Sequence, residues 1–459
     1  MAKKKQIELT IEEKLQNALV PKEEQPYKIP SNWCWSYWKY CGKFIAGNGF
    51  KNIYQGFTQY DIPYYKVGSL KFCDEGNYLI DETNTINEEI RTKLKAVKIP
   101  VNSIIFAKIG EAIKLNRRCL NKIECCIDNN LMAFISEKYF YKYIFYWTKS
   151  LNFYELTNAT TVPALRKTDL ENIPIPLPPL NEQQRIVNRI ESLFVKLDRA
   201  KELIENTLAQ FEQNKMAILH KAFIGELTAK WRKENNIDLS SWQDYQLKDI
   251  CEKITDGTHN SPINTDLGDY MYITAKNIKE EGIDLSKITY VSSDIHEKIY
   301  ARCNVEFGDV LYIKDGATTG IATINTIKEQ FSLLSSVAVL KPKKNKLLAK
   351  YLVYKLNSNE VRNMMINNMS GVAITRLTLT KIKQAKMKFP TIEEQQEIVN
   401  ILDNLLAKYN KIKNLEQQLE KIELLKKAIL AKAFRGELGT NNPDEESAEN
   451  LLKEILAEK

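Results

Sequence analysis

The sequence is poor in the residues that build metal centres. Its 459 residues include three histidines, His220, His259 and His296, and no two of its eight cysteines form a Cys-x-x-Cys pair. No histidine stands at ligand spacing from a cysteine, so we expect no bound metal. We interpret the cysteines as reduced, packed thiols of an intracellular protein.

Long apolar runs are also missing. No stretch of about 18 apolar residues occurs, so we expect no membrane span and no membrane partner. The opening segment, MAKKKQIELT, is basic but lacks the apolar core of a secretory signal. These two absences predict a cytoplasmic protein.

The motifs of several enzyme classes are absent as well. The sequence has no Gly-x-x-x-x-Gly-Lys-[Ser/Thr] phosphate loop, which argues against an ATPase motor. It also lacks the Pro-Pro tetrapeptide with which amino-methyltransferases hold a flipped base. We therefore expect this chain to carry no cofactor and no catalytic residue. Carboxylates and lysines between Asp309 and Lys314 could form a nuclease centre, although such a spacing is common by chance.

A long internal repeat is the main feature that the sequence does contain. LNEQQRIVNRI, which starts at Leu180, returns as IEEQQEIVNIL at Ile392, and Gln183 and Gln395 stand 212 residues apart. The two copies end on related segments, KAFIGEL and KAFRGEL. A repeat at this spacing indicates two similar halves, and therefore a function carried out at two places.

Length and composition predict several folded units. Hydrophobic residues make up 44% of the chain, which is enough for packed cores, and the chain is too long for one compact core. We expect an N-terminal helical segment, a globular region, a helical repeat, a second globular region, a second helical repeat and a helical tail. Their predicted limits are 1–27, 28–178, 179–237, 238–388, 389–440 and 441–459.

Both globular regions mix strands with helices, which predicts an α+β fold class with two α/β domains. Apolar, β-branched runs at Ile104–Ala107, Tyr270–Ile273 and Val310–Ile313 are typical of buried strands. Helices are expected at 138–151 and 347–357. The first region closes on IPIPLPPL, where four prolines forbid a helix and predict an extended entry into the first helical repeat.

Both helical repeats carry an apolar stripe. Apolar side chains recur at intervals of three and four residues, which is the spacing of a coiled-coil seam. About 40 residues without proline or glycine form a helix of roughly 60 Å. We expect the two helices to pack antiparallel and bury these stripes, although each could instead pack on its own globular region. The predicted seam residues are Ile186, Ile190, Leu193, Leu197, Ile204 and Phe211 in the first repeat, and Ile398, Leu402, Leu405, Tyr409, Leu419 and Ile422 in the second.

Positive charge is concentrated in the two globular regions. The chain has a formal net charge of +8, and residues 28–178 hold 20 Lys and Arg against 14 Asp and Glu. Residues 238–388 hold 21 against 17. Such an excess favours a polyanionic partner such as nucleic acid. A solvated, lysine-rich surface is the alternative, and charge alone does not choose between them.

Polar side chains gather in glycine-bearing turns at corresponding places of both regions. In the first region Lys108–Glu111 occupies the place of Lys314–Ala317, and Arg166 and Arg376 form a matched pair after VPAL and VAIT. For each residue alone an ordinary surface turn is the simpler interpretation, but the repetition favours contacts with phosphates and bases. The candidate DNA-binding residues are Lys66, Lys108, Arg117, Arg118, Arg166, Thr258, His259, Lys276, Asn277, Lys314, Thr318, Thr319 and Arg376.

With these features in place, the chain closely resembles the specificity subunits of type I restriction-modification systems. The likeness covers essentially the whole chain, and the first region lacks a clear counterpart of Asp256–His259. The segments that carry the resemblance are Ile175–Val187 with its echo Phe389–Val399, the paired endings Lys221–Thr228 and Lys432–Leu438, and the domain openings Ile29–Trp33 and Asp256–His259.

The resemblance implies that each globular region is a target recognition domain that reads one half of a bipartite, asymmetric double-stranded DNA site. The helical pair would set the spacer and dock two methyltransferase subunits, and restriction–translocase subunits would join for cleavage. S-adenosylmethionine, ATP and Mg would be bound by those partners, so this chain would be a non-catalytic subunit. The alternatives are a self-contained DNA methyltransferase or nuclease with duplicated recognition modules, and a coiled-coil scaffold without sequence preference.

Overall fold

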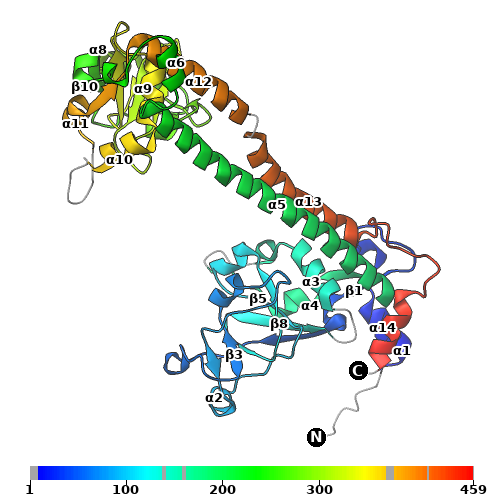
Figure 1. Cartoon of the computed structure of the whole chain (residues 1–459). Coiled ribbons are helices and arrows are strands. Elements are labelled where there is room, and N and C mark those ends of the chain that lie inside the picture. The colour runs from blue at the N-terminus through cyan, green and yellow to red at the C-terminus, as the bar shows by residue number, and fades with distance from the viewer. Residues whose placement is uncertain (1–8, 137–140, 158–161, 368–376, 411–412, 458–459) are drawn as a thin grey trace. The chain divides into compact units, whose positions relative to one another are not determined.

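The chain forms two compact units (Figure 1). Unit 1 combines Met1–Glu202 with Gln418–Lys459, and unit 2 comprises Leu203–Gln417. Each unit therefore holds one globular region, and the end of the chain returns to the first unit. The computed structural model describes residues 9–136, 141–157, 162–367, 377–410 and 413–457.

A four-stranded antiparallel sheet forms the core of unit 1. Its order is β2-β8-β5-β6, with bounds Gly42–Ala46, Leu131–Ser136, Ile104–Ala107 and Arg118–Leu120. A three-stranded sheet has the order β4-β3-β7, with bounds Thr85–Ile86, Ile62–Tyr65 and Cys126–Ile127. All four side chains of β5 are buried, as its apolar run predicts.

Unit 2 repeats this arrangement strand for strand. Its larger sheet has the order β11-β19-β16-β17, with bounds Cys251–Asp256, Val337–Pro342, Val310–Ile313 and Ala322–Ile324. Its smaller sheet has the order β15-β12-β18, with bounds Thr289–Val291, Tyr270–Ile273 and Ser332–Leu333. The β12–β18 pair is parallel, like the β3–β7 pair of unit 1. The two halves therefore share one fold, as the internal repeat predicts.

Shorter elements complete each unit. Unit 1 adds α2 (Glu88–Leu94), α3 (Tyr141–Ser150) and α4 (Lys167–Glu171), with the 3-10 turns η1 (Lys22–Glu24), η2 (Trp38–Cys41), η3 (Asn52–Tyr54), η4 (Val67–Lys71), η5 (Glu111–Leu115) and η6 (Phe153–Leu156). Unit 2 adds α6 (Ala229–Glu234), α7 (Leu247–Ile250), α8 (Ser293–Arg302), α9 (Ala349–Leu356), α10 (Asn359–Asn367) and α11 (Leu379–Gln384), with β13 (Ile278–Lys279), β14 (Gly282–Ile283), η7 (Leu239–Ser241) and η8 (Ala275–Asn277).

The proline-rich entry to the first long helix is extended, as predicted. It forms β9 (Pro174–Leu177), which pairs antiparallel with β1 (Cys34–Tyr37) in a two-stranded sheet. Proline is tolerated there because neither strand continues into a larger sheet. The equivalent pair in unit 2 is β10 (Gln243–Gln246) with β20 (Lys386–Phe389).

The helical repeats form α5 (Leu180–Phe223) in the first half, and α12 (Ile392–Asn410) and α13 (Lys413–Phe434) in the second. Within unit 1, α5 and α13 run antiparallel, because Asp198 pairs with Lys426 while Lys201 pairs with Glu423. The exposed ion pairs flank an apolar contact in which the first turns of α5 and the last turns of α13 share one core.

Every predicted seam residue whose side chain is described is buried or half-buried. Ile186, Ile190, Ile398, Leu402 and Ile422 are buried. The half-buried members are Leu193, Leu197, Ile204, Phe211, Leu405 and Leu419. Tyr409 lies outside the residues whose side chains are described.

Each globular core takes helices from both repeats. In unit 1, Ile186 and Ile190 of α5 join Ala433 and Phe434 of α13 in one apolar cluster, and the Tyr143 ring meets Phe434 edge-on at 5.4 Å. In unit 2, the end of α5 and the start of α12 share a second cluster, in which Phe223 meets Tyr351 edge-on at 5.6 Å. Pairing between the repeats and packing on the globular regions therefore occur together.

The two termini also meet within unit 1. Helix α1 (Ile11–Ala18) begins with a capping box between Thr10 and Glu13, which satisfies the first backbone donors. It packs against α14 (Ala448–Ala457), where the Nζ of Lys14 donates to the carbonyl of Leu456 at 3.4 Å.

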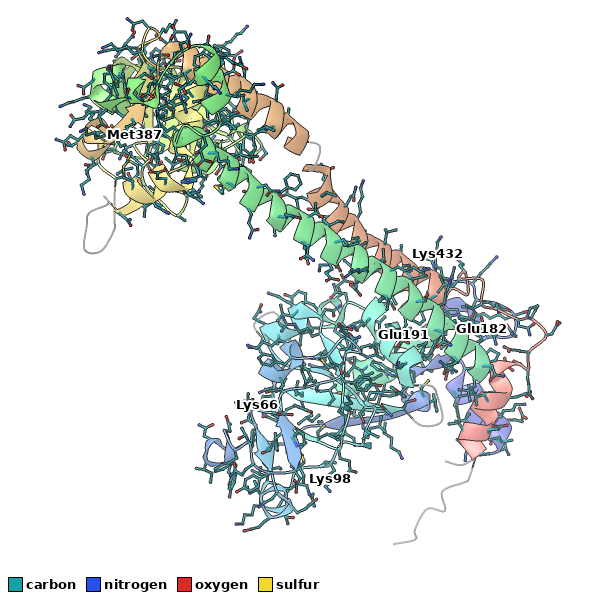
Figure 2. All side chains as sticks on the ribbon, viewed as in Figure 1. Lys66, Lys98, Glu182, Glu191, Met387 and Lys432 are labelled. Atoms are coloured by element: carbon teal, nitrogen blue, oxygen red, sulfur yellow. The ribbon has the colours of Figure 1, made fainter. Side chains whose placement is uncertain are left out.

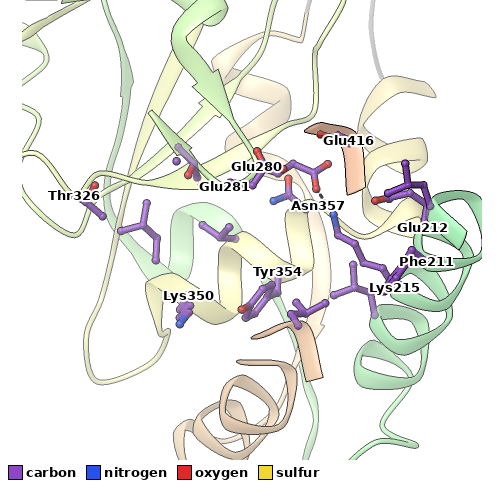
Figure 3. A pocket seen from close by; sticks show the side chains of 17 residues that line it. Phe211, Glu212, Lys215, Glu280, Glu281, Thr326, Lys350, Tyr354, Asn357 and Glu416 are labelled. Carbon is purple, nitrogen blue, oxygen red and sulfur yellow. Dashed lines mark hydrogen bonds and ion pairs between the residues drawn. The ribbon is translucent and has the colours of Figure 1, made fainter. Parts of the chain in front are cut away.

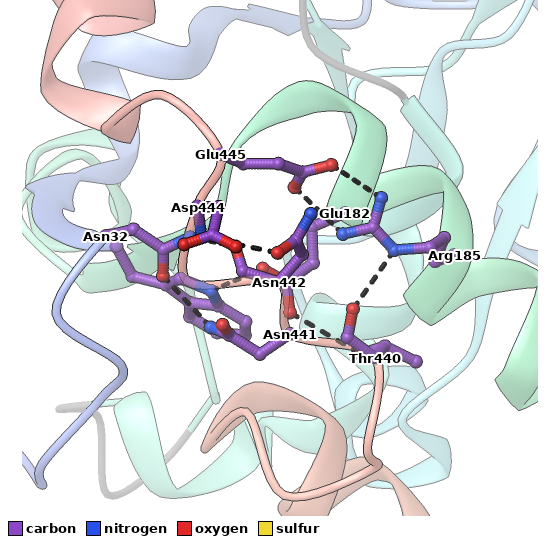
Figure 4. Close-up of polar contacts among 9 residues, drawn as sticks. Asn32, Glu182, Arg185, Thr440, Asn441, Asn442, Asp444 and Glu445 are labelled. Atoms are coloured by element: carbon purple, nitrogen blue, oxygen red, sulfur yellow. Dashed lines mark hydrogen bonds and ion pairs between the residues drawn. The ribbon is translucent and has the colours of Figure 1, made fainter.

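A buried glutamate stands in the first turn of each long helical repeat. Glu182 of the first repeat is labelled in Figures 2 and 4. The indole Nε1 of Trp33 donates to Glu182 Oε2 at 2.9 Å, and the indole of Trp242 donates to Glu394 Oε2 at the same distance. Both carboxylates are fully buried. Burial raises the pKa of the Glu182 carboxyl. A buried carboxylate needs such partners, so each glutamate fixes the domain opening to the helix start.

The glutamine next to each glutamate closes the preceding proline turn. Gln183 Nε2 donates to the carbonyl of Pro178, and Gln395 Nε2 donates to that of Pro390, both at 3.0 Å. These bonds satisfy carbonyls that a proline-containing turn leaves without a helical partner.

The repeated Gly-Glu-Leu endings need their glycine. Gly225 and Gly436 adopt positive φ values of 85° and 75° at the ends of α5 and α13. A Cβ on Gly436 would lie 2.4 Å from Pro30, and one on Gly225 would lie 2.5 Å from Leu239. Each turn therefore lies against a domain opening.

Lys355 places a charged amine in the apolar core of unit 2, where burial is unfavourable for the charge. Its side chain is 4% exposed, and its Nζ lies 4.8 Å from the Phe223 ring and 5.3 Å from the Phe389 ring. Burial lowers the pKa of this amine to about 8. The aromatic faces offset part of the cost of the buried cation.

Replacing this lysine tests that balance. Between its folded pKa of about 8 and the usual value of about 10.4, the unfolded chain binds more protons, so native stability should rise with pH. Lys355→Met removes this dependence, and we expect it to stabilise the protein by about 1–3 kcal/mol at pH 7 and by much less at pH 10. Thermal unfolding at both pH values measures the difference, with the exposed Lys344→Met as control. Equal destabilisation at both pH values would contradict the expectation.

Candidate nucleic-acid interface

The polar turns of each unit meet at one edge of its larger sheet. In unit 2, β11 and β16 both pair antiparallel with β19, so they run in the same direction and end at the same edge. Asp256 ends β11, and Lys314 directly follows β16. In unit 1, Ala46 correspondingly ends β2, and Lys108 directly follows β5. We call these two regions the loop edges.

Backbone hydrogen bonds make the two loop edges equivalent residue by residue. Lys108 N donates to the Asn130 carbonyl, and Lys314 N donates to the Ser336 carbonyl, both at 2.9 Å. The carbonyl of each lysine then accepts a bond, from Leu165 N in unit 1 and from Leu377 N in unit 2. The prediction that Lys108–Glu111 occupies the place of Lys314–Ala317 is therefore confirmed.

The same bonds change the predicted arginine pair. Because Leu165 corresponds to Leu377, Arg166 corresponds to Thr378, and both cap the next helix, α4 or α11. Aligning VPALR with VAITR by sequence therefore places Arg166 two positions away from its structural equivalent. Arg376 itself lies outside the described residues.

Unit 1 does possess a counterpart of the turn at Asp256–His259. Asn48 forms a parallel bridge with Asp128, as Thr258 does with Leu334. The preceding Gly47 and Gly257 lie against the neighbouring strand so closely that a Cβ on either would be 1.9 Å from a carbonyl oxygen. The sequence comparison missed this match because only the glycine is shared.

A charged cluster occupies the loop edge of unit 2. The Asp256 side chain is buried, and it receives Arg302 at 2.6 Å and Lys314 at 3.5 Å. His259 lies 3.0 Å from the same Arg302 nitrogen, and Lys314 also pairs with Asp315 at 2.9 Å. The cluster holds the turn after β11 against the turn after β16, while His259 and Arg302 keep an exposed face.

The candidate DNA-binding residues divide into three groups by exposure. Arg117, Arg166, His259, Lys276 and Thr318 are exposed, and Lys66, Lys108 and Thr258 are half-buried. Lys66, which is labelled in Figure 2, donates through its Nζ to Gln55 Oε1 at 2.7 Å. The buried candidates are Arg118, Asn277, Lys314 and Thr319.

The buried candidates shape the loops from inside the fold. Arg118 donates to the carbonyls of Asn116 and Leu151 and stacks on the Phe153 ring at 3.6 Å. Burial lowers the pKa of its guanidinium to about 9, which leaves it charged at neutral pH. The Asn277 Oδ1 accepts a hydrogen bond from Thr274 N and so closes the capping box of η8. The Thr319 hydroxyl donates to the Gly316 carbonyl at 2.7 Å. These contacts correct the expectation that all four residues present their side chains to DNA.

A pocket of about 560 Å³ lies elsewhere in unit 2 (Figure 3). Its lining includes Glu212, Glu280, Glu281 and Glu416 against Lys215 and Lys350, and Lys215 pairs with Glu280 at 2.6 Å. An acidic lining repels phosphate groups, so this pocket does not suit a nucleotide or DNA backbone.

The described residues form neither a metal cluster nor a membrane-spanning helix. No group of three or more His, Cys, Asp or Glu side chains in them could hold a metal ion. None of their helices combines the length and apolar character that a membrane crossing requires.

The fold defines a protein of two equivalent modules, each with a polar loop edge and each closed by helices of both repeats. A family model described as the type I restriction modification DNA specificity domain matches residues 52–212 and 240–424. The chain therefore belongs to the family of type I restriction-modification DNA specificity proteins.

Individual relatives agree with this assignment. The EcoBI specificity subunit of Escherichia coli is 29% identical over 330 residues, which cover 66% of this chain and 68% of that protein. The EcoKI specificity subunit of Escherichia coli K12 is 26% identical over 318 residues, with the same shares.

Solved structures share the fold. The HsdS subunit from Thermoanaerobacter tengcongensis aligns with a TM-score of 0.50 at 18% identity, and the match covers 90% of this chain and 100% of the HsdS chain. A chain from a study of complex assembly and conformational transition of the type I R-M system has a TM-score of 0.65 at 19% identity, with the same coverage.

Arg117 and Arg118 can test whether buried candidates stabilise the fold while exposed candidates do not. Arg118→Ala should destabilise unit 1 by about 2–4 kcal/mol, because it removes buried hydrogen bonds and ring packing. Arg117→Ala should change stability by less than about 0.5 kcal/mol, since its side chain is exposed. Chemical denaturation of both variants measures the contrast, and equal losses would contradict it.

Proposed function

We propose that this chain is the sequence-recognition subunit of a type I restriction-modification complex, in which each globular region reads one half of a bipartite, asymmetric DNA site. One observation carries the proposal: the same loop edge is built twice, from the same strands and backbone bonds, in two basic regions. Family membership supports DNA recognition as the shared activity. The relatives are named as specificity subunits, which favours a non-catalytic role over a self-contained methyltransferase or nuclease.

The exposed candidate side chains would make the contacts. Arg117 and Arg166 in unit 1, and His259 and Lys276 in unit 2, are exposed. Lys276 lies beside the loop edge of unit 2, because Ala275 N donates to Ser336 Oγ at 3.4 Å. Arginine and lysine there suit phosphate oxygens and guanine edges. The buried Asp256 and Arg118 would hold the loops in a fixed shape for that contact.

The long helices would set the spacer between the half-sites and dock two methyltransferase subunits. Helix α5 continues without a break from unit 1 into unit 2, as a spacer requires. Within unit 1, Val195, Leu424 and Leu425 are 68%, 63% and 50% exposed on α5 and α13. Exposed large apolar side chains on these helices would suit a protein partner. Restriction subunits would join for cleavage, and S-adenosylmethionine, ATP and Mg would belong to the partner subunits.

A substitution at the loop edge tests DNA recognition. Lys276→Ala in the assembled complex should weaken binding by about 1–3 kcal/mol if the lysine contacts a base, and should relax one half-site only. If it contacts a phosphate, affinity should fall for all sequences and the salt dependence should flatten. Binding titrations at several salt concentrations distinguish these cases.

Lys344→Ala provides the matched control, since this exposed lysine follows β19 at the end of the larger sheet opposite the loop edge. Unchanged affinity and sequence preference in Lys276→Ala would refute the role of this loop edge. An equal loss of affinity in both variants would mean that the change in net charge, and not a contact at the loop edge, causes the effect.

An insertion tests the spacer. Four residues added to α5 within positions 195–215 lengthen the helix by about 6 Å, which corresponds to about one or two base pairs of 3.4 Å. Genomic adenine methylation mapped by long-read sequencing should show both half-sites unchanged and a longer spacer. Alanine substitutions at Asn206 and Gln213, without an insertion, serve as control. An unchanged spacer in an active complex would contradict the proposed role of the helix.

A further inference from the structure

Two cysteines of unit 1 have their sulfur atoms in contact. Cys73 follows η4 and Cys119 lies in β6, and their Sγ atoms are 2.7 Å apart. A disulfide bond holds its sulfurs about 2.05 Å apart, so a shift of less than about 1 Å would join them. The two positions are 46 residues apart in the sequence, so the fold creates this contact.

The backbone fixes both sides of the pair. Cys73 forms an isolated bridge with Leu79, which makes residues 73–79 a closed turn. That turn lies along β6, because Leu79 N donates to the Leu120 carbonyl at 2.8 Å and Leu120 N donates to the Asn77 carbonyl at 2.9 Å. The sulfurs are therefore brought together by paired main chain and not only by side-chain rotation.

The surroundings favour a thiolate at Cys73. The hydrogen bond with the Cys119 thiol lowers the pKa of Cys73, and the cations of Lys149 and Arg117 lower it further against the effect of burial. The same hydrogen bond and its own burial raise the pKa of Cys119. Lys149 is held in place by a hydrogen bond to Asn77, which belongs to the same turn.

The two thiols also differ in access. Cys73 is half-buried, whereas Cys119 is 2% exposed. The other cysteines offer a contrast, since Cys34, Cys251 and Cys303 are buried and burial raises the pKa of each to about 12.

We propose that Cys73 and Cys119 form a reversible dithiol–disulfide pair, in which Cys73 is the attacking thiol and Cys119 the resolving thiol. The assignment goes beyond DNA recognition and does not depend on it. In an intracellular protein such a pair stays reduced until an oxidant of the peroxide class reaches it.

The reaction with hydrogen peroxide balances without another reactant. The Cys73 thiolate attacks one peroxide oxygen, so an S–O bond forms, the O–O bond breaks, and the departing hydroxide takes a proton to give water. The Cys119 sulfur then attacks the sulfenic sulfur, so the S–S bond forms and the S–O bond breaks. The hydroxyl leaves with the Cys119 proton as a second water. Two thiols lose two electrons in total, and a thiol reductant reverses the step.

Mass spectrometry of the full chain tests the pair. After brief peroxide treatment, we expect one peptide cross-link between Cys73 and Cys119, which dithiothreitol reverses. We expect Cys73 to react at least about tenfold faster than Cys251 or Cys303, the factor that one pKa unit gives in thiolate fraction. Cross-linking of the wild-type chain needs no variant and therefore no assumption about folding.

Single substitutions assign the roles. Cys119→Ser should leave a sulfenic acid on Cys73 that dimedone captures, and Cys73→Ser should leave Cys119 unmodified. Cys251→Ser, which alters a buried cysteine of unit 2, should leave the cross-link intact. Absence of a 73–119 cross-link, or oxidation of Cys73 no faster than that of the buried cysteines, would overturn the proposal.

Discussion

The buried carboxylate in the first turn of each helical repeat is the contact on which the rest of the architecture depends. Glu182 and Glu394 accept a hydrogen bond from the tryptophan that opens the same globular region. Burying a carboxylate costs free energy unless hydrogen-bond donors surround it. The domain opening, the helix start and the Gly-Glu-Leu ending therefore have to meet at this carboxylate. Thr440 in unit 1 and Thr228 in unit 2 come from that ending and complete the set. Unit 2 adds Arg232 directly to its glutamate, whereas unit 1 places Arg185 on Glu445 nearby.

This convergence explains why the repeats cannot be separated into two independent halves. The partners of Glu182 lie at Trp33 and Thr440, so the closing segment of the second half completes the first domain. The end of the first long helix likewise lies in the core of the second domain through Leu219 and Phe223. Contacts between residues about 260 positions apart, such as Arg185 with Glu445, must form late because they close a long loop. We infer that unit 1 reaches full stability only after the whole chain is synthesised, because its closing segment is Gln418–Lys459.

Much of this fold could be predicted from the sequence, because the spacing of apolar residues follows their burial and the internal repeat follows the duplicated fold. The strands Tyr270–Ile273 and Val310–Ile313 have the bounds that their apolar runs predict. The candidate interface was less accessible to sequence reasoning. Arg117 and Arg118 are identical in type, and only the fold separates the exposed side chain from the buried one. The turn at Gly47 could not be recognised from the sequence. It requires only a glycine, which lets the backbone approach the neighbouring strand closely, and the residues around Gly47 differ from those around Gly257. The Trp–Glu pairs did repeat in the sequence and could have been found, since both partners recur at nearly equal spacing.

Equivalent scaffolds with unlike loop edges have a consequence for recognition. The backbone bonds that position Lys108 and Lys314 are the same, but Lys314 is neutralised by Asp256 and Asp315, whereas Ala46 replaces that aspartate in unit 1. Unit 2 instead presents His259 and Arg302 around its buried carboxylate. Two identical edges would read identical half-sites, so edges that differ in charge and hydrogen-bond donors fit two different ones. Under the proposed function, the shared sheets would supply the position of each reader, and the loop side chains would supply the asymmetry of the DNA site.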